Sequence, residues 1–175
     1  MWPPAGHPEG VPLQVKNMAD KVKPVPEGVS TITPHLSVRD ATEAIDFYQR
    51  AFGAQLLFVH RLPNSKVMHA TMKVGDSRFQ LADEFPGMGT PAPPTLGGSP
   101  VVLNLCVEDV DQLFKRAVAA GAKVTLPLEN QFWGARYGQI VNPFGHSWAL
   151  FSHVEDVPAD ELKLRADAAF ARMAG

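Results

Sequence analysis

The sequence predicts an α+β fold made of two βαβββ units followed by a C-terminal helix. The first observation is an internal repeat, because residues 38–54 and 107–122 both read as a strand end, a helix and a glycine stop. The second is that one shift of 69 residues carries Val38 to Val107 and also carries Phe79 to Trp148. Repeats of this length mark supersecondary units, so this repeat sets the expected fold.

Each predicted helix begins with a capping signal. Asp40 is followed three residues later by Glu43, and Asp109 by Gln112, which is the spacing of a capping box. Apolar side chains recur on one face of both helices, at Ala44, Ile45, Tyr48 and Phe52 and at Leu113, Phe114, Ala117 and Val118. We therefore expect both helices to pack on a sheet through that face.

Composition divides the chain into five segments. Residues 1–28 are rich in proline and are predicted to be a flexible arm, and residues 29–84 form the first βαβββ unit. Residues 85–100 are a Pro/Gly-rich linker. Residues 101–157 form the second βαβββ unit, and residues 158–175 contain the C-terminal helix.

Alternating apolar and polar residues predict four strands in each unit. In the first unit the predicted strands span 30–38, 55–62, 67–74 and 77–82. In the second unit they span 101–107, 123–126, 136–141 and 146–152, with a loop at 128–134. The dipeptide Asp83-Glu84 is predicted to be a solvated strand end, with a general base as the alternative.

Charge and cysteine content exclude several classes of partner. Lys and Arg number 16 against 18 Asp and Glu, so we expect no nucleic-acid or membrane partner. The single cysteine, Cys106, excludes an internal disulfide, and no apolar run is long enough to span a membrane. Without a secretory signal, these features predict a cytoplasmic protein.

Several short motifs resemble one known superfamily. They are Thr-Pro-His-Leu at 33–36, Val-Met-His-Ala at 67–70, Phe-Trp-Gly-Ala-Arg-Tyr-Gly at 132–138 and Asn-Pro-Phe-Gly-His at 142–146. With the doubled unit, they resemble the vicinal-oxygen-chelate superfamily of glyoxalase I, extradiol dioxygenases and bleomycin-resistance proteins, and within it the PhnB-like branch. The resemblance implies curved mixed sheets with helices outside, a cavity enclosed by paired units, and a homodimer. Whether the units pair within one chain or across the homodimer stays open.

The resemblance also implies where a metal site would lie. Members similar to glyoxalase I take metal ligands from positions that correspond to Thr33, Gln80, Val102 and Ala149. Only Gln80 has a side chain that can bind a metal ion, so no metal cofactor is assigned. The two histidines and one carboxylate of extradiol dioxygenases are missing as well.

A shifted metal site stays open as an alternative. His35, His69 and Gln80, with Glu84 at the strand end, are the candidate ligands for Zn, Ni or Fe. The competing interpretation is that His35 and His69 are pocket histidines that hydrogen-bond to neighbours or to a ligand. His146 is expected to satisfy backbone groups of its own turn.

The resemblance further implies which residues line the pocket. The candidate ligand-binding residues are Thr33, Gln80, Asn104, Trp133, Arg136, Tyr137 and Phe151. Ile32 is expected on the helix side. Trp133 and Tyr137 can form an aromatic wall and Arg136 a fork for a carboxylate, phosphate or carbonyl. The alternatives are that Trp133 covers the barrel end and that Arg136 pairs with an acidic neighbour.

Two hypotheses for function follow. The first is a glyoxalase-like pocket protein that binds a small, partly apolar organic compound in resistance or detoxification. The second is a metal-dependent isomerase or lyase in which His35 or His69 moves a proton next to a carbonyl. The missing ligands favour the first hypothesis, and the two histidines keep the second open.

Overall fold

The structure is a computed structural model that describes residues 23–173. Most of the predicted N-terminal arm therefore lies outside the described residues. The elements are β1 (His35–Val38), α1 (Ala41–Phe52), β2 (Gln55–Arg61), β3 (Val67–Val74), β4 (Ser77–Asp83), α2 (Pro93–Leu96), β5 (Val102–Cys106), α3 (Val110–Ala119), β6 (Lys123–Asn130), β7 (Ala135–Val141), β8 (Ser147–His153) and α4 (Ala159–Met173). This order confirms the predicted fold class.

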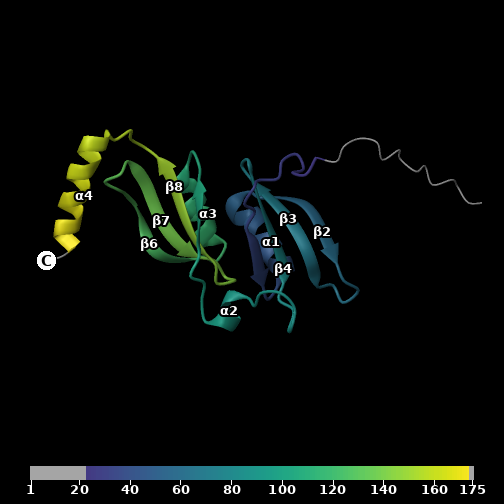
Figure 1. Ribbon diagram of the computed structural model, residues 1–175. Helices are drawn as coiled ribbons and strands as arrows, with labels where there is room; N and C mark the ends of the chain where they lie inside the picture. The colour runs from purple at the N-terminus through teal and green to yellow at the C-terminus, as the bar shows by residue number, and fades with distance from the viewer. Residues whose placement is uncertain (1–22, 174–175) are drawn as a thin grey trace, which may run out of the picture.

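The two units have the same topology. The strand order is β1-β4-β3-β2 in the first sheet and β5-β8-β7-β6 in the second. In each sheet the first and last strands of the unit pair in parallel, and the other neighbours are antiparallel. Helices α1 and α3 lie between the two sheets, and α4 extends beyond the second sheet (Figure 1). None of the helices within residues 23–173 is long and apolar enough to cross a membrane.

One apolar core joins the two units. The indole of Trp148, on β8, makes edge contacts with Tyr48 and Phe52 of α1 at centroid distances of 5.7 and 4.9 Å. It also contacts Phe79 of β4 at 6.0 Å. The side chain of Asn142 donates a hydrogen bond of 2.9 Å to the buried hydroxyl of Tyr48, whose pKa burial raises. The helix-facing sides of the two sheets are thus turned toward each other.

The predicted helix caps are confirmed. Asp40 accepts a hydrogen bond from the backbone N–H of Glu43, and Asp109 accepts one from Gln112, both at 2.9 Å. These bonds occupy N–H groups that the first helical turn leaves unpaired. Gly53 ends α1 in the left-handed conformation, with φ of 66°, as a C-terminal glycine is expected to do.

A second hydrogen bond, from the first backbone N–H of each helix to a side chain of the sheet, also fixes the helix start, and this bond was not predicted. Asp83, only 7 % exposed, accepts hydrogen bonds from the backbone N–H of Ala41 at 3.1 Å and of Val67 at 2.6 Å. In the second unit, the hydroxyl of Ser152 accepts a bond of 3.0 Å from the N–H of Val110. The prediction of a solvated strand end at Asp83 is wrong, because two backbone donors need this carboxylate inside the unit.

Strand limits differ from prediction by more than one residue in two places. β1 begins at His35 rather than at residue 30, and Ile32, expected on the helix side, is 84 % exposed. Thr33 instead bonds through its hydroxyl to the carbonyl of Ser30, within a bend. β6 continues to Asn130 through the predicted loop, because it is an edge strand and Pro127 need not donate to a further neighbour.

Candidate functional site

The face of the first sheet that points away from α1 carries most of the predicted polar site residues. Strand register places His35, Gln80, Thr71 and Phe58 in one row across it. His69 lies two residues before Thr71 and therefore on the same face. We call the surface formed by these five side chains the first outer face. Its aromatic member Phe58 is 54 % exposed.

Two histidines meet on the first outer face. The rings of His35 and His69 are stacked, with centroids 6.1 Å apart. Nδ1 of His35 lies 3.5 Å from Oε1 of Gln80, and Nε2 of His69 lies 3.2 Å from the hydroxyl of Thr71. Burial, and then repulsion from the other histidines, lowers the pKa of His69, so its ring is neutral at neutral pH. The face can therefore both donate and accept hydrogen bonds.

The second sheet presents an aromatic wall on its corresponding face. Cys106, Phe151 and Tyr137 are neighbours in register, and Asn104 lies two residues from Cys106 on β5. The ring of Tyr137 contacts Trp133 at 5.7 Å and Phe151 at 6.4 Å. We call these five side chains the second outer face. Trp133 is 40 % exposed, so the wall is open to solvent.

The two outer faces do not meet within one chain. Because the helix-facing sides of the sheets are turned toward each other, the outer faces point in opposite directions (Figure 1). The structure brings His35, His69 and Gln80 together on one face and Asn104, Trp133, Tyr137 and Phe151 together on the other. Residues 23–173 of a single copy therefore form no cavity that is enclosed by both faces.

Three predicted site residues lie apart from both clusters, and Thr33 and Glu84 are two of them. Thr33 precedes β1, in the bend described above. Glu84 accepts hydrogen bonds from the backbone of Ala92 and from the hydroxyl of Thr95 at 2.9 Å, and these bonds lower the pKa of its carboxyl. Glu84 therefore attaches the linker to β4. Within residues 23–173, no three His, Cys, Asp or Glu side chains are grouped to hold one metal ion.

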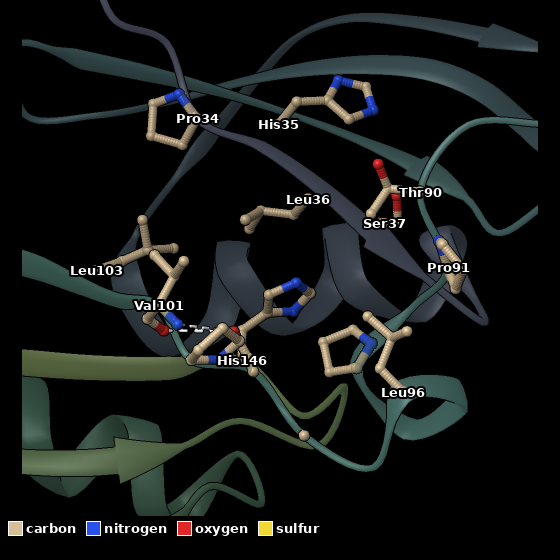
Figure 2. Close-up of a pocket in the computed structure, with 14 residues that line it drawn as sticks. Pro34, His35, Leu36, Ser37, Thr90, Pro91, Leu96, Val101, Leu103 and His146 are labelled. Atoms are coloured by element: carbon tan, nitrogen blue, oxygen red, sulfur yellow. Dashed lines mark hydrogen bonds between the residues drawn. The ribbon is translucent and has the colours of Figure 1, made fainter.

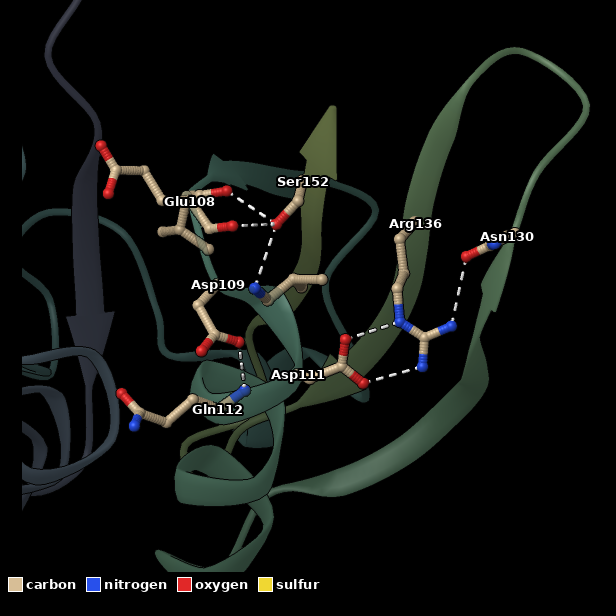
Figure 3. Close-up of polar contacts among 9 residues, drawn as sticks. Glu108, Asp109, Asp111, Gln112, Asn130, Arg136 and Ser152 are labelled. Atoms are coloured by element: carbon tan, nitrogen blue, oxygen red, sulfur yellow. Dashed lines mark hydrogen bonds and ion pairs between the residues drawn. The ribbon is translucent and has the colours of Figure 1, made fainter. Parts of the chain in front are cut away.

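Arg136 points to the opposite side of the second sheet from Tyr137. Its guanidinium binds both carboxylate oxygens of Asp111 on α3, at 2.7 and 2.8 Å, and donates to Asn130 at 3.2 Å (Figure 3). This pairing lowers the pKa of the Asp111 carboxyl. Neighbouring residues of a strand point to opposite faces, so the period-two rule separates Arg136 from the aromatic wall. This position agrees with the alternative prediction that Arg136 pairs with an acidic neighbour. It does not agree with a ligand-binding role for Arg136 on the aromatic wall.

A cavity of about 420 Å³ lies next to the linker. Its wall is formed by the edges of β1 and β5, by the linker with α2, and by His146 (Figure 2). Most of the lining is apolar, including Leu36, Leu96, Leu103 and Pro91. Sequence reasoning missed this site, because its walls come from segments that are far apart in the chain.

His146 does not serve the backbone of its own turn as predicted. The side chain of Asn142 does so instead, accepting bonds from the N–H of Phe144 at 3.1 Å and of His146 at 2.8 Å. The imidazole is only 7 % exposed, and its Nδ1 has no hydrogen-bond partner among the described residues. An unpaired buried polar atom costs about 1–3 kcal/mol. Burial lowers the pKa of His146 to about 4, so the ring is neutral at physiological pH.

The buried His146 predicts a loss of stability in mild acid. Its pKa in the folded chain, about 4, lies below the ordinary value of 6.5, so the unfolded chain binds the proton more readily. This contribution is complete above pH 6.5 and falls by about 1 kcal/mol per pH unit between pH 6.5 and 4. Urea unfolding at several pH values measures the slope. His146→Gln is expected to flatten it, and equal slopes in both proteins would contradict the prediction.

The fold and the two outer faces define a class of doubled βαβββ proteins with open sheet faces. The family model described as Glyoxalase/Bleomycin resistance protein/Dioxygenase superfamily matches residues 29–150. The chain therefore belongs to this superfamily, as the sequence motifs predicted.

Relatives share the fold over most of their length. An uncharacterized protein of Mycobacterium bovis is 44 % identical over 135 residues, covering 75 % of this chain and 89 % of the relative. The crystal structure of TioX from Micromonospora sp. ML1 is 27 % identical, with a TM-score of 0.57, and covers 72 % of this chain and 100 % of that one. A PhnB protein from Bacillus cereus is 21 % identical, with a TM-score of 0.57, and covers 70 % and 99 % of the two chains. The last likeness concerns the fold alone.

Proposed function

We propose that the chain forms a homodimer that binds a small, partly apolar organic compound between the first outer face of one copy and the second outer face of the other. The observation that carries this proposal is the opposite orientation of the two outer faces. Each face is a half-site, with Phe58 and Trp133 54 % and 40 % exposed. A second copy can cover both faces at once, and a two-fold dimer then contains two equivalent pockets.

The chemistry of the two faces supports a ligand with a flat apolar body and a polar group. Trp133, Tyr137 and Phe151 offer ring surfaces for the apolar body. His35, Gln80 and the neutral His69 offer hydrogen-bond donors and acceptors for the polar group. Pockets of this mixed kind, mostly apolar with a few polar groups, are typical of small-molecule sites. A role in resistance or detoxification fits the family.

The donor set supports binding rather than metal-dependent catalysis. The usual metal positions of the superfamily hold Thr33 and Gln80 on one side, and Val102 and Ala149 on the other. Valine and alanine carry no donor atom, and threonine with glutamine is a weak set for a divalent transition metal. These residues do not fit the metal of the glyoxalases, and no step in the proposed function uses one.

Mixing two variants tests the shared pocket. His69→Ala removes a first-face group and Tyr137→Ala a second-face group, so each homodimer is expected to lose binding of anilinonaphthalene sulfonate by about tenfold. A mixed dimer contains one pocket with both substitutions and one with neither. After unfolding and refolding together, an equimolar mixture is expected to regain about a quarter of the wild-type sites, because half the dimers are mixed and each has one intact pocket. Fluorescence titration counts the sites.

A matched mixture provides the control. His69→Ala and Gln80→Ala both alter the first face, so every pocket in their mixed dimer carries a substitution and no sites are regained. Recovery in this control, or none in the first mixture, would overturn a pocket shared between copies. Sedimentation equilibrium of the wild-type protein must also show a dimer.

The histidine pair favours one second candidate, an isomerase or lyase that moves a proton next to a carbonyl. His35 and His69 are 6.1 Å apart between ring centroids, and the neutral His69 can accept a proton. Incubation of the bound compound in D₂O separates the two functions. A binder is expected to return the compound without deuterium at carbon, whereas the enzyme would exchange it, and His69→Ala would abolish that exchange.

A further inference from the structure

The cavity beside the linker adjoins the first outer face and has a buried polar group that belongs to neither outer face. It lies between the free edges of β1 and β5, and the segment from Thr90 to Val101 closes it on one side (Figure 2). Its volume of about 420 Å³ is in the range of pockets that hold small organic molecules. His35 touches its rim, but the histidine partner of the first outer face, His69, is not part of the lining.

The edge of β1 adds backbone groups to this cavity. Pro34 and Val38 accept hydrogen bonds from β4 through their carbonyl groups. In a parallel pair, the residues between them direct their main-chain groups to the other side. The N–H and C=O groups of His35 and Ser37 therefore point away from β4, toward the side where β5 and the cavity lie. The cavity has hydrogen-bonding groups at its rim and an apolar interior.

Five polar side chains line the cavity, and His146 is the only one of them that is buried; the others are His35, Ser37, Thr90 and Ser99. The ring of His146 lines the cavity together with the side chains of Leu36, Leu103 and Leu96 (Figure 2). The residue is 7 % exposed, and Nδ1 has no partner among the described residues. Because Asn142 already satisfies the turn, the ring is not needed for local backbone bonding. A buried ring with unused hydrogen-bonding capacity beside an apolar cavity is suited to a ligand that supplies one polar group.

We propose that this cavity is a second binding site, which takes an uncharged, mainly apolar compound with a single hydroxyl group that hydrogen-bonds to the imidazole of His146. A hydroxyl suits a neutral imidazole because it can donate to one ring nitrogen or accept from the other. The site is formed within one chain, so it does not depend on the proposed dimer.

Charge selects against ionic ligands at this site. The two histidines are the only titratable side chains that line the cavity within the described residues, and no Lys, Arg, Asp or Glu is among them. Burial keeps His146 neutral at physiological pH. A carboxylate or an ammonium group would enter the cavity without a counter-charge, which is costly in an apolar environment.

Benzyl alcohol and ethylbenzene form a matched pair of probes for the test. They have nearly the same shape, and only the first has a hydroxyl. In the full chain with ¹⁵N-labelled histidine, benzyl alcohol is expected to bind saturably and to shift the ring ¹⁵N signals of His146. It is expected to bind about three- to tenfold more tightly than ethylbenzene. His146→Gln, which lacks these ring signals, assigns them.

Variants decide whether His146 and this cavity are responsible. His146→Phe is expected to remove the preference for benzyl alcohol over ethylbenzene, whereas Leu164→Ala, at an exposed position of α4, leaves both affinities unchanged. The ring signals of the wild-type protein test the proposal even if His146→Phe does not fold. The proposal is overturned by an absence of saturable binding, as for a cavity that holds only water or a partner's segment, by equal affinity for the two probes, or by unshifted His146 signals.

Discussion

Replacing Trp148 with alanine is expected to lower the free energy of unfolding by about 3–5 kcal/mol. The indole is buried and contacts Tyr48, Phe52 and Phe79 of the first unit, although Trp148 itself belongs to the second. Alanine would leave a cavity at the place where the two units share their core. Urea unfolding followed by far-ultraviolet circular dichroism measures the loss.

Two further variants separate this effect from the loss of any tryptophan. Trp148→Phe keeps an aromatic ring against Tyr48, Phe52 and Phe79 and leaves a smaller cavity, so it is expected to cost less than half as much as alanine. Trp133→Ala, at a 40 % exposed position, is expected to cost about 1 kcal/mol or less. A loss in Trp148→Ala no larger than that in Trp133→Ala would contradict a core shared by both units.

Asp83→Ala is expected to destabilise the protein by about 3 kcal/mol, because it leaves two backbone N–H groups without their acceptor. Those groups belong to Ala41, at the start of α1, and to Val67, at the start of β3. Both N–H groups would then need a water molecule or another acceptor inside the unit. The same unfolding measurement, at neutral pH, gives the difference.

The second unit provides the matched control for Asp83. Ser152 occupies the corresponding position 69 residues later, where its hydroxyl accepts one bond, from the N–H of Val110, and donates to the carbonyl groups of Val107 and Glu108. Because this neutral group leaves one backbone N–H unpaired rather than two, Ser152→Ala is expected to cost about 1–2 kcal/mol, less than Asp83→Ala. Asp83→Asn is expected to cost an intermediate amount. If Asp83→Ala were no more harmful than Ser152→Ala, the carboxylate would not be holding both segment ends.

Local signals predicted the elements well. The capping pairs led by Asp40 and Asp109 act over three residues, so the chain sequence alone reveals them. Predictions of strand limits failed where those limits depend on pairing with a neighbouring strand. β6 extends through Pro127 because that strand lies at a sheet edge, and β1 begins late because the residues before it bend instead of pairing.

The candidate site was predicted in part. Alternation along the strands placed His35, His69 and Gln80 on one face and Tyr137 with Phe151 on another, as the register shows. The same alternation could have excluded Arg136 from the candidate ligand-binding residues, because Arg136 is next to Tyr137 in one strand and therefore points to the other face. The role of Asp83 also had a signal, because the repeat pairs it with Ser152, a second small acceptor at the end of a closing strand.

The sequence by itself determined the doubled βαβββ units, their helix caps and the membership of the superfamily, because these depend on periodicity and short-range bonds. Only the tertiary structure decided that α1 and α3 lie between the sheets, which turns the two outer faces away from each other. The position of the buried His146 beside an apolar cavity was likewise decided by the tertiary structure alone. The physical reason is that such arrangements depend on contacts such as those of Trp148 with α1 and β4, between segments about 70 to 100 residues apart, which no local pattern records.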